Sequence, residues 1–385
     1  MKKNLFFFLV AGMAFASCVS DETVGEQGVK EPAKLTFSHP LMQSNGSTRA
    51  HYYGEIGNHM YPGTSTVYHY PNEEHFDIYA VQHTGDFAGW ESATPHEMNN
   101  THVSYDKEVD GWAPKTDEGG YYYWPSSDKM SFAASSPAEL ECGATRAYGA
   151  TGLTIENFEV NEDASKHFDL LYSIRTLNQT AENMRNDASY YSGIPIDFKH
   201  ALSSVRFSIS NESEAVVLLK SIKVYGVKYK GTFKENLTED SDDYTKQTRE
   251  PKWDVNAELI STPYVGFEGS VQFRLNPQYV AELAAADTDE PGEVENCNQL
   301  LLMPQTLTDD AKVVVTYTVN GQEKSKTAEL NNGIDLDDKA VHEWLPGVRY
   351  TYRLVYGKSA ADKDRIYFAP GAEAWTDHST IVIDL

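Results

Sequence analysis

The chain has 385 residues and carries 57 acidic against 32 basic side chains, a net charge of −25 at pH 7. A surface of this charge repels phosphate backbones and anionic lipid, which excludes nucleic acid and anionic membrane surfaces as partners of the folded part. At about 150 residues per domain, the length predicts two domains.

The first 17 residues are typical of a secretory signal peptide. Two lysines precede an apolar run from residue 5 to residue 16, which is shorter than the about 20 residues that span a bilayer. Small residues then lead to Cys18 in a pattern that resembles a lipobox, although Phe15 stands where Leu is usual. We expect lipid on Cys18, followed by an acidic tether to residue 33. The alternative is ordinary secretion with an incidental cysteine.

A short apolar alternation follows the tether. Leu35 and Phe37 alternate with Thr36 and Ser38. Because alternate residues of a strand point to the same side, this pattern predicts an edge strand that places Leu35 and Phe37 in a core.

The next segment has the composition of an exposed cleavage site. Residues 43–50 are small and polar, and Arg49 is the only basic residue between Lys34 and Lys107. A trypsin-like protease would therefore cut between Arg49 and Ala50, which would release the lipid and the first strand together. The alternative is that Arg49 is a solvated loop residue of a protein that stays tethered.

Alternation of apolar and polar residues dominates the rest of the chain. Residues 313–319 alternate up to Asn320-Gly321, a strong two-residue hairpin signal. Similar strands are expected at residues 221–225 and 350–356. Many short strands separated by turns predict an all-β protein built of β-sandwiches.

Two further segments carry specific expectations. At residues 205–210, three apolar side chains alternate with Arg and Ser, which predicts one buried and one solvated face. Residues 278–285 are the best short candidate for a helix.

A domain boundary is expected near residue 193. Residues 178–187 are polar and loop-like, and a new series of strands begins at residue 194. We therefore expect an N-terminal sandwich at 34–192 and a C-terminal sandwich at 193–385.

The last residues have the chemistry of a donated strand, at 379–385. Ile381, Ile383 and Leu385 share one face, and Val382 lies on the other with Thr380. The alternative is that this segment pairs within its own domain as the final strand.

No metal or cofactor site is expected. Eight of the 12 histidines lie between residues 39 and 102, but none has the His-x-x-x-His spacing of a helical zinc site. The sequence contains no nucleophile elbow, phosphate loop or dinucleotide fingerprint, so we do not expect an enzyme.

Two other groups of residues have structural explanations. The run 121–124, three tyrosines and a tryptophan, could stack on sugars, but alternation predicts a strand with about half of it buried. Cys142 and Cys297 are expected as two unbridged, buried thiols rather than as a disulfide.

Seven short motifs and a late tryptophan follow one another across nearly the whole exported chain. They are TRA at 48–50, DIYA at 77–80, YWP at 123–125, MSF at 130–132, DLLY at 169–172, FKHALSSV at 198–205, WLPGVRY at 344–350 and Trp375. In this order they resemble the fimbrillin family, the type V pilins of the Bacteroidales.

This resemblance implies two tandem transthyretin-like β-sandwiches and assembly into fimbriae that contribute to adhesion. Subunits of the family are exported as outer-membrane lipoproteins, trimmed by an arginine-specific protease, and joined when a neighbour's strand fills the emptied groove. The implied partners are other copies or related fimbrial subunits, the protease, and a host or bacterial surface receptor. The alternative function is a surface glycan-binding lipoprotein that does not polymerise and keeps Cys18 as its first residue.

Overall fold

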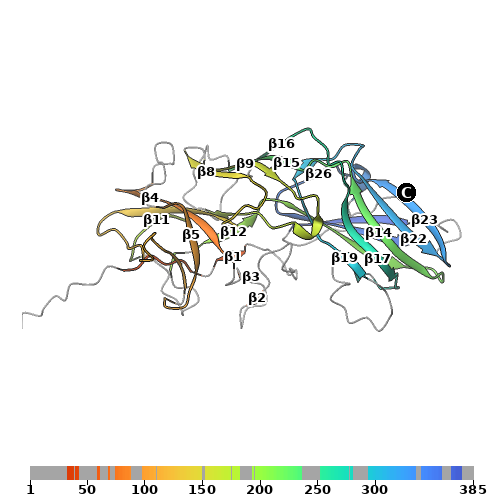
Figure 1. The fold of residues 1–385 in the computed structure, drawn as a ribbon, viewed down its shortest axis with the longest axis horizontal. Helices are drawn as coiled ribbons and strands as arrows, with labels where there is room; N and C mark the ends of the chain where they lie inside the picture. The colour runs from red at the N-terminus through yellow and green to blue at the C-terminus, as the bar shows by residue number, and fades with distance from the viewer. Residues whose placement is uncertain are drawn as a thin grey trace, which may run out of the picture. The chain divides into compact units, whose positions relative to one another are not determined.

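The regular secondary structure of the computed structural model is almost entirely β-strand, and most of the strands lie in antiparallel sheets (Figure 1). The predicted all-β class is confirmed, and none of the described segments forms a helix long and apolar enough to cross a membrane. The structure describes residues 33–38, 40–42, 59–60, 68–69, 74–87, 98–109, 111–149, 152–174, 176–182, 193–194, 196–235, 252–276, 278–280, 294–334, 340–357 and 366–374.

The first sheet has ten strands in the order β2-β3-β1-β12-β10-β7-β4-β5-β6, with β11 also paired to β7. Its neighbours are antiparallel except for the parallel pair β1 and β12. The strands are β1 (Leu41–Met42), β2 (His59–Met60), β3 (Tyr68–His69), β4 (Phe76–His83), β5 (Met98–Asp106), β6 (Gly111–Pro114), β7 (Lys129–Ser136), β10 (Leu171–Ile174), β11 (Thr176–Gln179) and β12 (Asp197–His200).

One face of this sheet buries what we call the N-terminal core. Phe76 of β4 packs edge-to-face against Phe198 of β12, with ring centroids 5.5 Å apart, so strands distant in sequence share one apolar cluster. The members of the core are Leu35, Phe37, Phe76, Ile78, Ala80, Met98, Val103, Trp112, Trp124, Met130, Phe132, Ala134, Leu171, Ile194, Ile196 and Phe198.

Two five-stranded sheets face each other across a second core and form a β-sandwich. Gly266 of β17 lies directly beneath the Phe207 ring of β13, where a Cβ would come within 3.0 Å of that ring. The first sheet consists of β13 (Ser203–Asn211), β18 (Gln278–Tyr279), β20 (Leu300–Leu302), β27 (Val348–Tyr356) and β28 (Ile366–Ala374). The second consists of β14 (Val217–Tyr225), β17 (Tyr264–Gln272), β19 (Val294–Cys297), β22 (Lys312–Val319) and β23 (Gln322–Glu329), in the order β19-β17-β14-β22-β23 (Figure 1).

A four-stranded sheet, β16-β15-β9-β8, joins residues from both predicted domains. Arg146 of β8 forms a buried ion pair with Asp77 of β4, and Tyr148 of β8 stacks on Tyr79 of β4 at 4.8 Å. The strands are β8 (Thr145–Gly149), β9 (Gly152–Glu159), β15 (Lys230–Lys234) and β16 (Lys252–Val255). The division of the chain at residue 193 stays a prediction.

Short elements complete the described fold. They are the strand pairs β21 (Gln305–Thr306) with β26 (Glu343–Trp344) and β24 (Gly333–Ile334) with β25 (Ala340–Val341), and the 3₁₀ turns η1 (Ala164–Lys166) and η5 (Leu330–Asn332).

The hairpin predicted at Asn320-Gly321 is confirmed. β22 and β23 pair in register from Lys312 with Glu329 to Val319 with Gln322. Asn320 and Gly321 have φ of 50° and 82°, the left-handed values that a two-residue turn of this hand needs.

Two sequence predictions were wrong in part. β13 is buried on both faces, because Arg206 donates through Nε to Thr351 of β27 at 2.8 Å and lies 4.0 Å from the Tyr279 ring centroid. Residues 278–279, predicted to start a helix, form strand β18 because their backbone pairs with Ser208 and Ile209. Residues 281–285 of that helix prediction lie outside the described residues.

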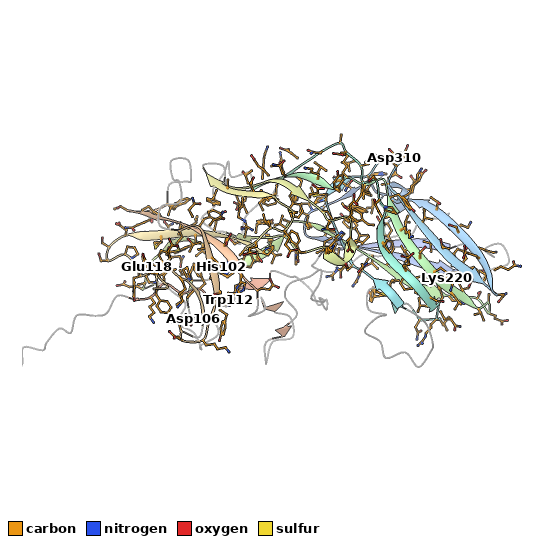
Figure 2. The ribbon with its side chains drawn as sticks, viewed as in Figure 1. His102, Asp106, Trp112, Glu118, Lys220 and Asp310 are labelled. Atoms are coloured by element: carbon orange, nitrogen blue, oxygen red, sulfur yellow. The ribbon has the colours of Figure 1, made fainter. Side chains whose placement is uncertain are left out.

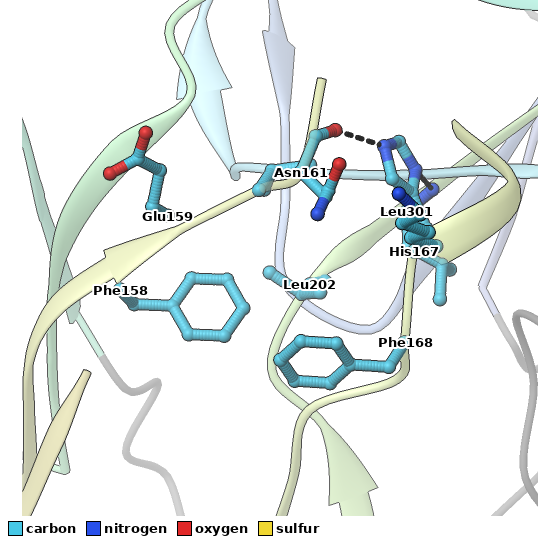
Figure 3. Close-up of a pocket in the computed structure, with 9 residues that line it drawn as sticks. Phe158, Glu159, Asn161, His167, Phe168, Leu202 and Leu301 are labelled. Atoms are coloured by element: carbon cyan, nitrogen blue, oxygen red, sulfur yellow. Dashed lines mark hydrogen bonds between the residues drawn. The ribbon is translucent and has the colours of Figure 1, made fainter. Parts of the chain in front are cut away.

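His167 is a fully buried imidazole beside a small pocket between β9 and η1 (Figure 3). Its Nε2 donates to the carbonyl oxygen of Asn161 (2.9 Å), and its Nδ1 accepts from the N–H of Leu301 (3.2 Å). Acceptance at Nδ1 requires the neutral ring with its proton on Nε2, and burial lowers the pKa of His167 to about 4.

This residue should make the stability of the protein depend on pH. The imidazole of the unfolded chain titrates near 6.5, so between pH 6.5 and 4 the unfolded state binds more protons than the folded state. The stability that His167 contributes is therefore lost as the pH falls through this range. In H167Q this titration is absent. We expect the difference in unfolding free energy between wild type and H167Q to shrink by about 3 kcal/mol from pH 7 to pH 4 in denaturant titrations. A difference that stays constant would contradict this assignment.

Candidate functional site

Residues 33–38 form an extended segment, which we call the N-terminal ribbon, along the open side of the N-terminal core. Backbone hydrogen bonds join one edge of the ribbon antiparallel to β6 and to residues 121–124. These bonds run from Leu35 N–H to Tyr122 O (2.8 Å), Trp124 N–H to Ala33 O (3.0 Å), Phe37 N–H to Trp112 O (2.7 Å) and Trp112 N–H to Phe37 O (3.2 Å).

The other edge of the ribbon pairs in parallel with Ile194. The N–H of Ser38 donates to the carbonyl oxygen of Ile194, and the N–H of Ile194 donates to that of Thr36, both at 2.9 Å. The ribbon therefore has partners on both edges. The prediction of an edge strand was wrong on this point, because a segment far along the chain returns to cover the second edge.

The two apolar side chains of the ribbon fill the N-terminal core. Leu35 and Phe37 are both completely buried. The Phe37 ring meets Phe76 of β4 (6.0 Å, 80°) and Phe132 of β7 (5.5 Å, 90°) edge-to-face, the arrangement that aromatic quadrupoles favour. Their burial agrees with the alternation of the sequence, whereas their role as a detachable strand stays a prediction.

Gly193 permits the close approach of the ribbon. A Cβ at this position would lie 2.8 Å from the Phe37 carbonyl carbon and from the Thr36 oxygen, well inside van der Waals contact. The φ of Gly193 is +115°, a conformation that residues with a side chain rarely adopt. Only glycine therefore fits beside the seated ribbon.

A charged aromatic cluster, here called the Tyr121 site, meets the ribbon at its outward face. The ring centroid of Tyr121 lies 3.9 Å from Nζ of Lys34 and 3.3 Å from Nζ of Lys115. The Tyr121 hydroxyl donates to Oδ2 of Asp106 (2.7 Å) and lies 3.1 Å from Oε2 of Glu108. Ammonium groups over an aromatic face are attracted by its quadrupole, so the ring connects the ribbon to the sheet.

Asp106 is held in its ionised form. Burial acts to raise its pKa, but hydrogen bonds from Lys115, from the Tyr121 hydroxyl and from the Glu108 N–H outweigh burial and lower the pKa to about 2. Lys115 lies 2.5 Å from its carboxylate. Asp106 at the end of β5 and Trp112 of β6 are both labelled in Figure 2.

The expected half-burial of residues 121–124 is confirmed. Trp124 and Tyr122 pack toward the N-terminal core, whereas Tyr123 is 50% exposed. Sequence reasoning missed Gly193, Ile194 and Lys34, because their roles depend on pairing between segments that are distant in the chain. The start of a new strand series at residue 194 was the one available signal.

The remaining predicted site residues lie outside the described part of the chain. They are Cys18, Arg49, Ala50, Ile381, Val382, Ile383 and Leu385. Their roles stay predictions.

Cys142 and Cys297 do not form a disulfide, and both are half-buried rather than buried. The segments that the structure describes contain no group of three or more His, Cys, Asp or Glu side chains suited to a metal ion.

Comparison with known proteins gives one family and several related structures. The model of a family described as fimbrillin-like matches residues 65–367. None of the curated proteins matches the sequence.

Solved structures align with the chain at low identity. A candidate cell adhesion protein of Bacteroides uniformis is 13% identical with a TM-score of 0.43, over 88% of this chain and 98% of its own. One from Bacteroides ovatus is 12% identical with a TM-score of 0.41, over 92% and 99%. A fimbrial protein of Bacteroides ovatus is 14% identical with a TM-score of 0.33, over 84% of this chain and 48% of its own.

The substitution G193A should loosen the ribbon selectively. The added methyl group collides with the ribbon backbone, so we expect a loss of roughly 1–3 kcal/mol and faster amide hydrogen exchange at Phe37 and Ser38. G149A is the matched control, since a Cβ there meets no atom within 4 Å. Equal hydrogen exchange of the ribbon amides in G193A and G149A would show that Gly193 does not determine how firmly the ribbon is bound.

Proposed function

Because this chain belongs to the fimbrillin-like family, we propose that it is a fimbrial subunit that is exported as a lipoprotein, trimmed after Arg49 and assembled by strand exchange. At the level of the family, it is a fimbrial-type adhesion protein from a group of structural, non-enzymatic proteins.

The observation that carries the proposal is the seat of the N-terminal ribbon. Leu35 and Phe37 complete an apolar core, yet they belong to a short segment bonded to β6, to residues 121–124 and to Ile194 rather than to a long strand. Removal of the ribbon would leave an apolar groove with unpaired backbone groups on both sides. An extended strand from another chain can fill the groove and pair with these backbone groups by β-augmentation.

The free energy that holds the ribbon in its groove is small enough to allow exchange. Burial of Leu35 and Phe37 stabilises the seated ribbon by about 5 kcal/mol, and its six backbone hydrogen bonds add about 6 kcal/mol. Fixing six residues costs about 9 kcal/mol of conformational entropy, which leaves about 2 kcal/mol in favour of the bound state of residues 33–38. Release after a cut at Arg49 must also break the pairing of β1 (Leu41–Met42) with β12 and β3. A ribbon cut from the chain also gains translational and rotational freedom when it leaves, so cleavage tips this balance toward release.

In the proposed assembly, the groove of one subunit receives a strand of another. Contact between a groove at one place and a strand at another is heterologous, and such contacts build open filaments instead of closed rings. Residues 379–385 are the candidate donor, with Ile381, Ile383 and Leu385 as the side chains that would enter a groove. Cys18 would carry the lipid of the precursor at the outer membrane.

The substitution R49A should block conversion of the monomer to polymer by an arginine-specific protease, because no other basic residue lies between Lys34 and Lys107. Size-exclusion chromatography and N-terminal sequencing are the measurements, with Ala50 as the first residue of the wild-type product. R49K is the matched control: trypsin should cut it and restore polymerisation, whereas the arginine-specific protease should not. Polymerisation of R49A at the wild-type rate would rule out trimming at this residue, and a mature protein that begins at Cys18 would favour a tethered glycan binder.

Deletion of residues 380–385 should leave a folded monomer that accepts a strand but does not extend a filament. The deleted residues would supply the donor face, whereas the groove is built from residues 33–198. Circular dichroism checks the fold, and an equimolar mixture with wild type should produce short, capped polymers. Loss of folding on deletion would instead assign these residues to the chain's own domain.

A further inference from the structure

The outward face of the ribbon carries a second element of recognition besides the apolar groove. Lys34 pairs across from Tyr123 in an antiparallel bridge, and its ammonium group reaches diagonally over the ring of Tyr121. Any strand that takes the place of the ribbon presents its own residue at this register. The Tyr121 site therefore meets one defined side chain of the incoming strand.

The charges of the Tyr121 site require a cation at that register. Asp106 and Glu108 supply two carboxylates near the Tyr121 hydroxyl, and Lys115 supplies one ammonium group. With Lys34 in place the four charges balance. Without Lys34 the site keeps one excess negative charge, in a chain whose net charge is already −25. A neutral or acidic replacement also leaves one face of the Tyr121 ring without its ammonium partner.

The chain's own candidate donor does not supply this cation. Residues 379–385 read Ser-Thr-Ile-Val-Ile-Asp-Leu and contain no Lys or Arg. Asp384 would add a negative charge near the site in any register that brings it to the outward face. The face of this segment with Ile381, Ile383 and Leu385 suits the apolar groove, but its other face offers no cation to the Tyr121 site.

We propose that the groove selects an incoming strand with Lys or Arg at the register of Lys34, and therefore prefers a strand of a different subunit to residues 379–385 of another copy. This inference rests on the strand exchange proposed above. The partner is defined by its chemistry: large apolar residues at two alternate positions that replace Leu35 and Phe37, and a basic residue on the outward face directly before the first of them.

A competition experiment tests the selection. The full-length protein is cut after Arg49, and labelled peptides compete for the groove: residues 33–40, the same peptide with Lys34→Thr or Lys34→Asp, and residues 379–385. Displacement of the ribbon is followed by fluorescence anisotropy. We expect the Lys34→Thr peptide to bind about 2- to 5-fold more weakly than the unchanged peptide, as for an exposed cation–π contact, and the Lys34→Asp and 379–385 peptides to bind more weakly still.

Variants of the protein separate this contact from general damage to the groove. Y121L should abolish the preference for the Lys34 peptide over the Lys34→Thr peptide, whereas Y121F, which keeps the ring, should retain most of it. Y123L is the matched control, because Tyr123 is exposed on the same face and should leave the preference unchanged. Each variant is first checked for binding of the Lys34→Thr peptide, which reports an intact groove.

The outcomes separate the two proposals. If all the peptides displace the ribbon equally well, or if residues 379–385 bind as tightly as residues 33–40, selection by the Tyr121 site is wrong and strand exchange stands. If no peptide displaces the ribbon from the cut protein, strand exchange itself fails and the selection fails with it.

Discussion

The N-terminal core depends on the contact of Phe37 with Phe76 and Phe132, two rings on adjacent strands of the ten-stranded sheet. Phe37 is not part of that sheet. It enters from a ribbon whose edges are bonded to β6, to residues 121–124 and to Ile194, so the same six residues close the core and satisfy the backbone of three separate segments. Because both functions reside in one short segment, the core is complete only while that segment, or a replacement with the same alternation, is in place.

The second core is closed differently. Its two facing sheets contain long strands joined in extended registers, such as the nine-residue strands β13 and β27, which run parallel from Ser204 with Arg349 to Asn211 with Tyr356. Among the described residues, rings of this core such as Phe207 of β13 and Tyr352 of β27 come from these long strands. The strand exchange proposed above would therefore open the N-terminal core and leave the second core intact.

The sequence predicted best where the signal is local. The hairpin at Asn320-Gly321 and the burial of Leu35 and Phe37 follow from turn chemistry and from alternation over a few residues. The polar face of β13 was predicted to be solvated, but its burial is decided by Thr351 and Tyr279, which lie far away in the chain. Gly193 and the pairing of Lys34 with Tyr121 were missed for the same reason, since nothing near them in sequence specifies the partner.

The low pKa of Asp106 determines which changes in the surroundings the Tyr121 site can sense. A carboxylate that titrates near 2 stays ionised in any mildly acidic medium, so acidification leaves its charge as it is. Dissolved ions at about 0.15 M screen exposed charges that lie more than about 8 Å apart, so they act on the net charge of the chain far more than on the 2.5 Å contact between Lys115 and Asp106. The contact of Lys115 with Asp106, which supports the Tyr121 ring beneath Lys34, therefore keeps its charges in mild acid and at physiological salt.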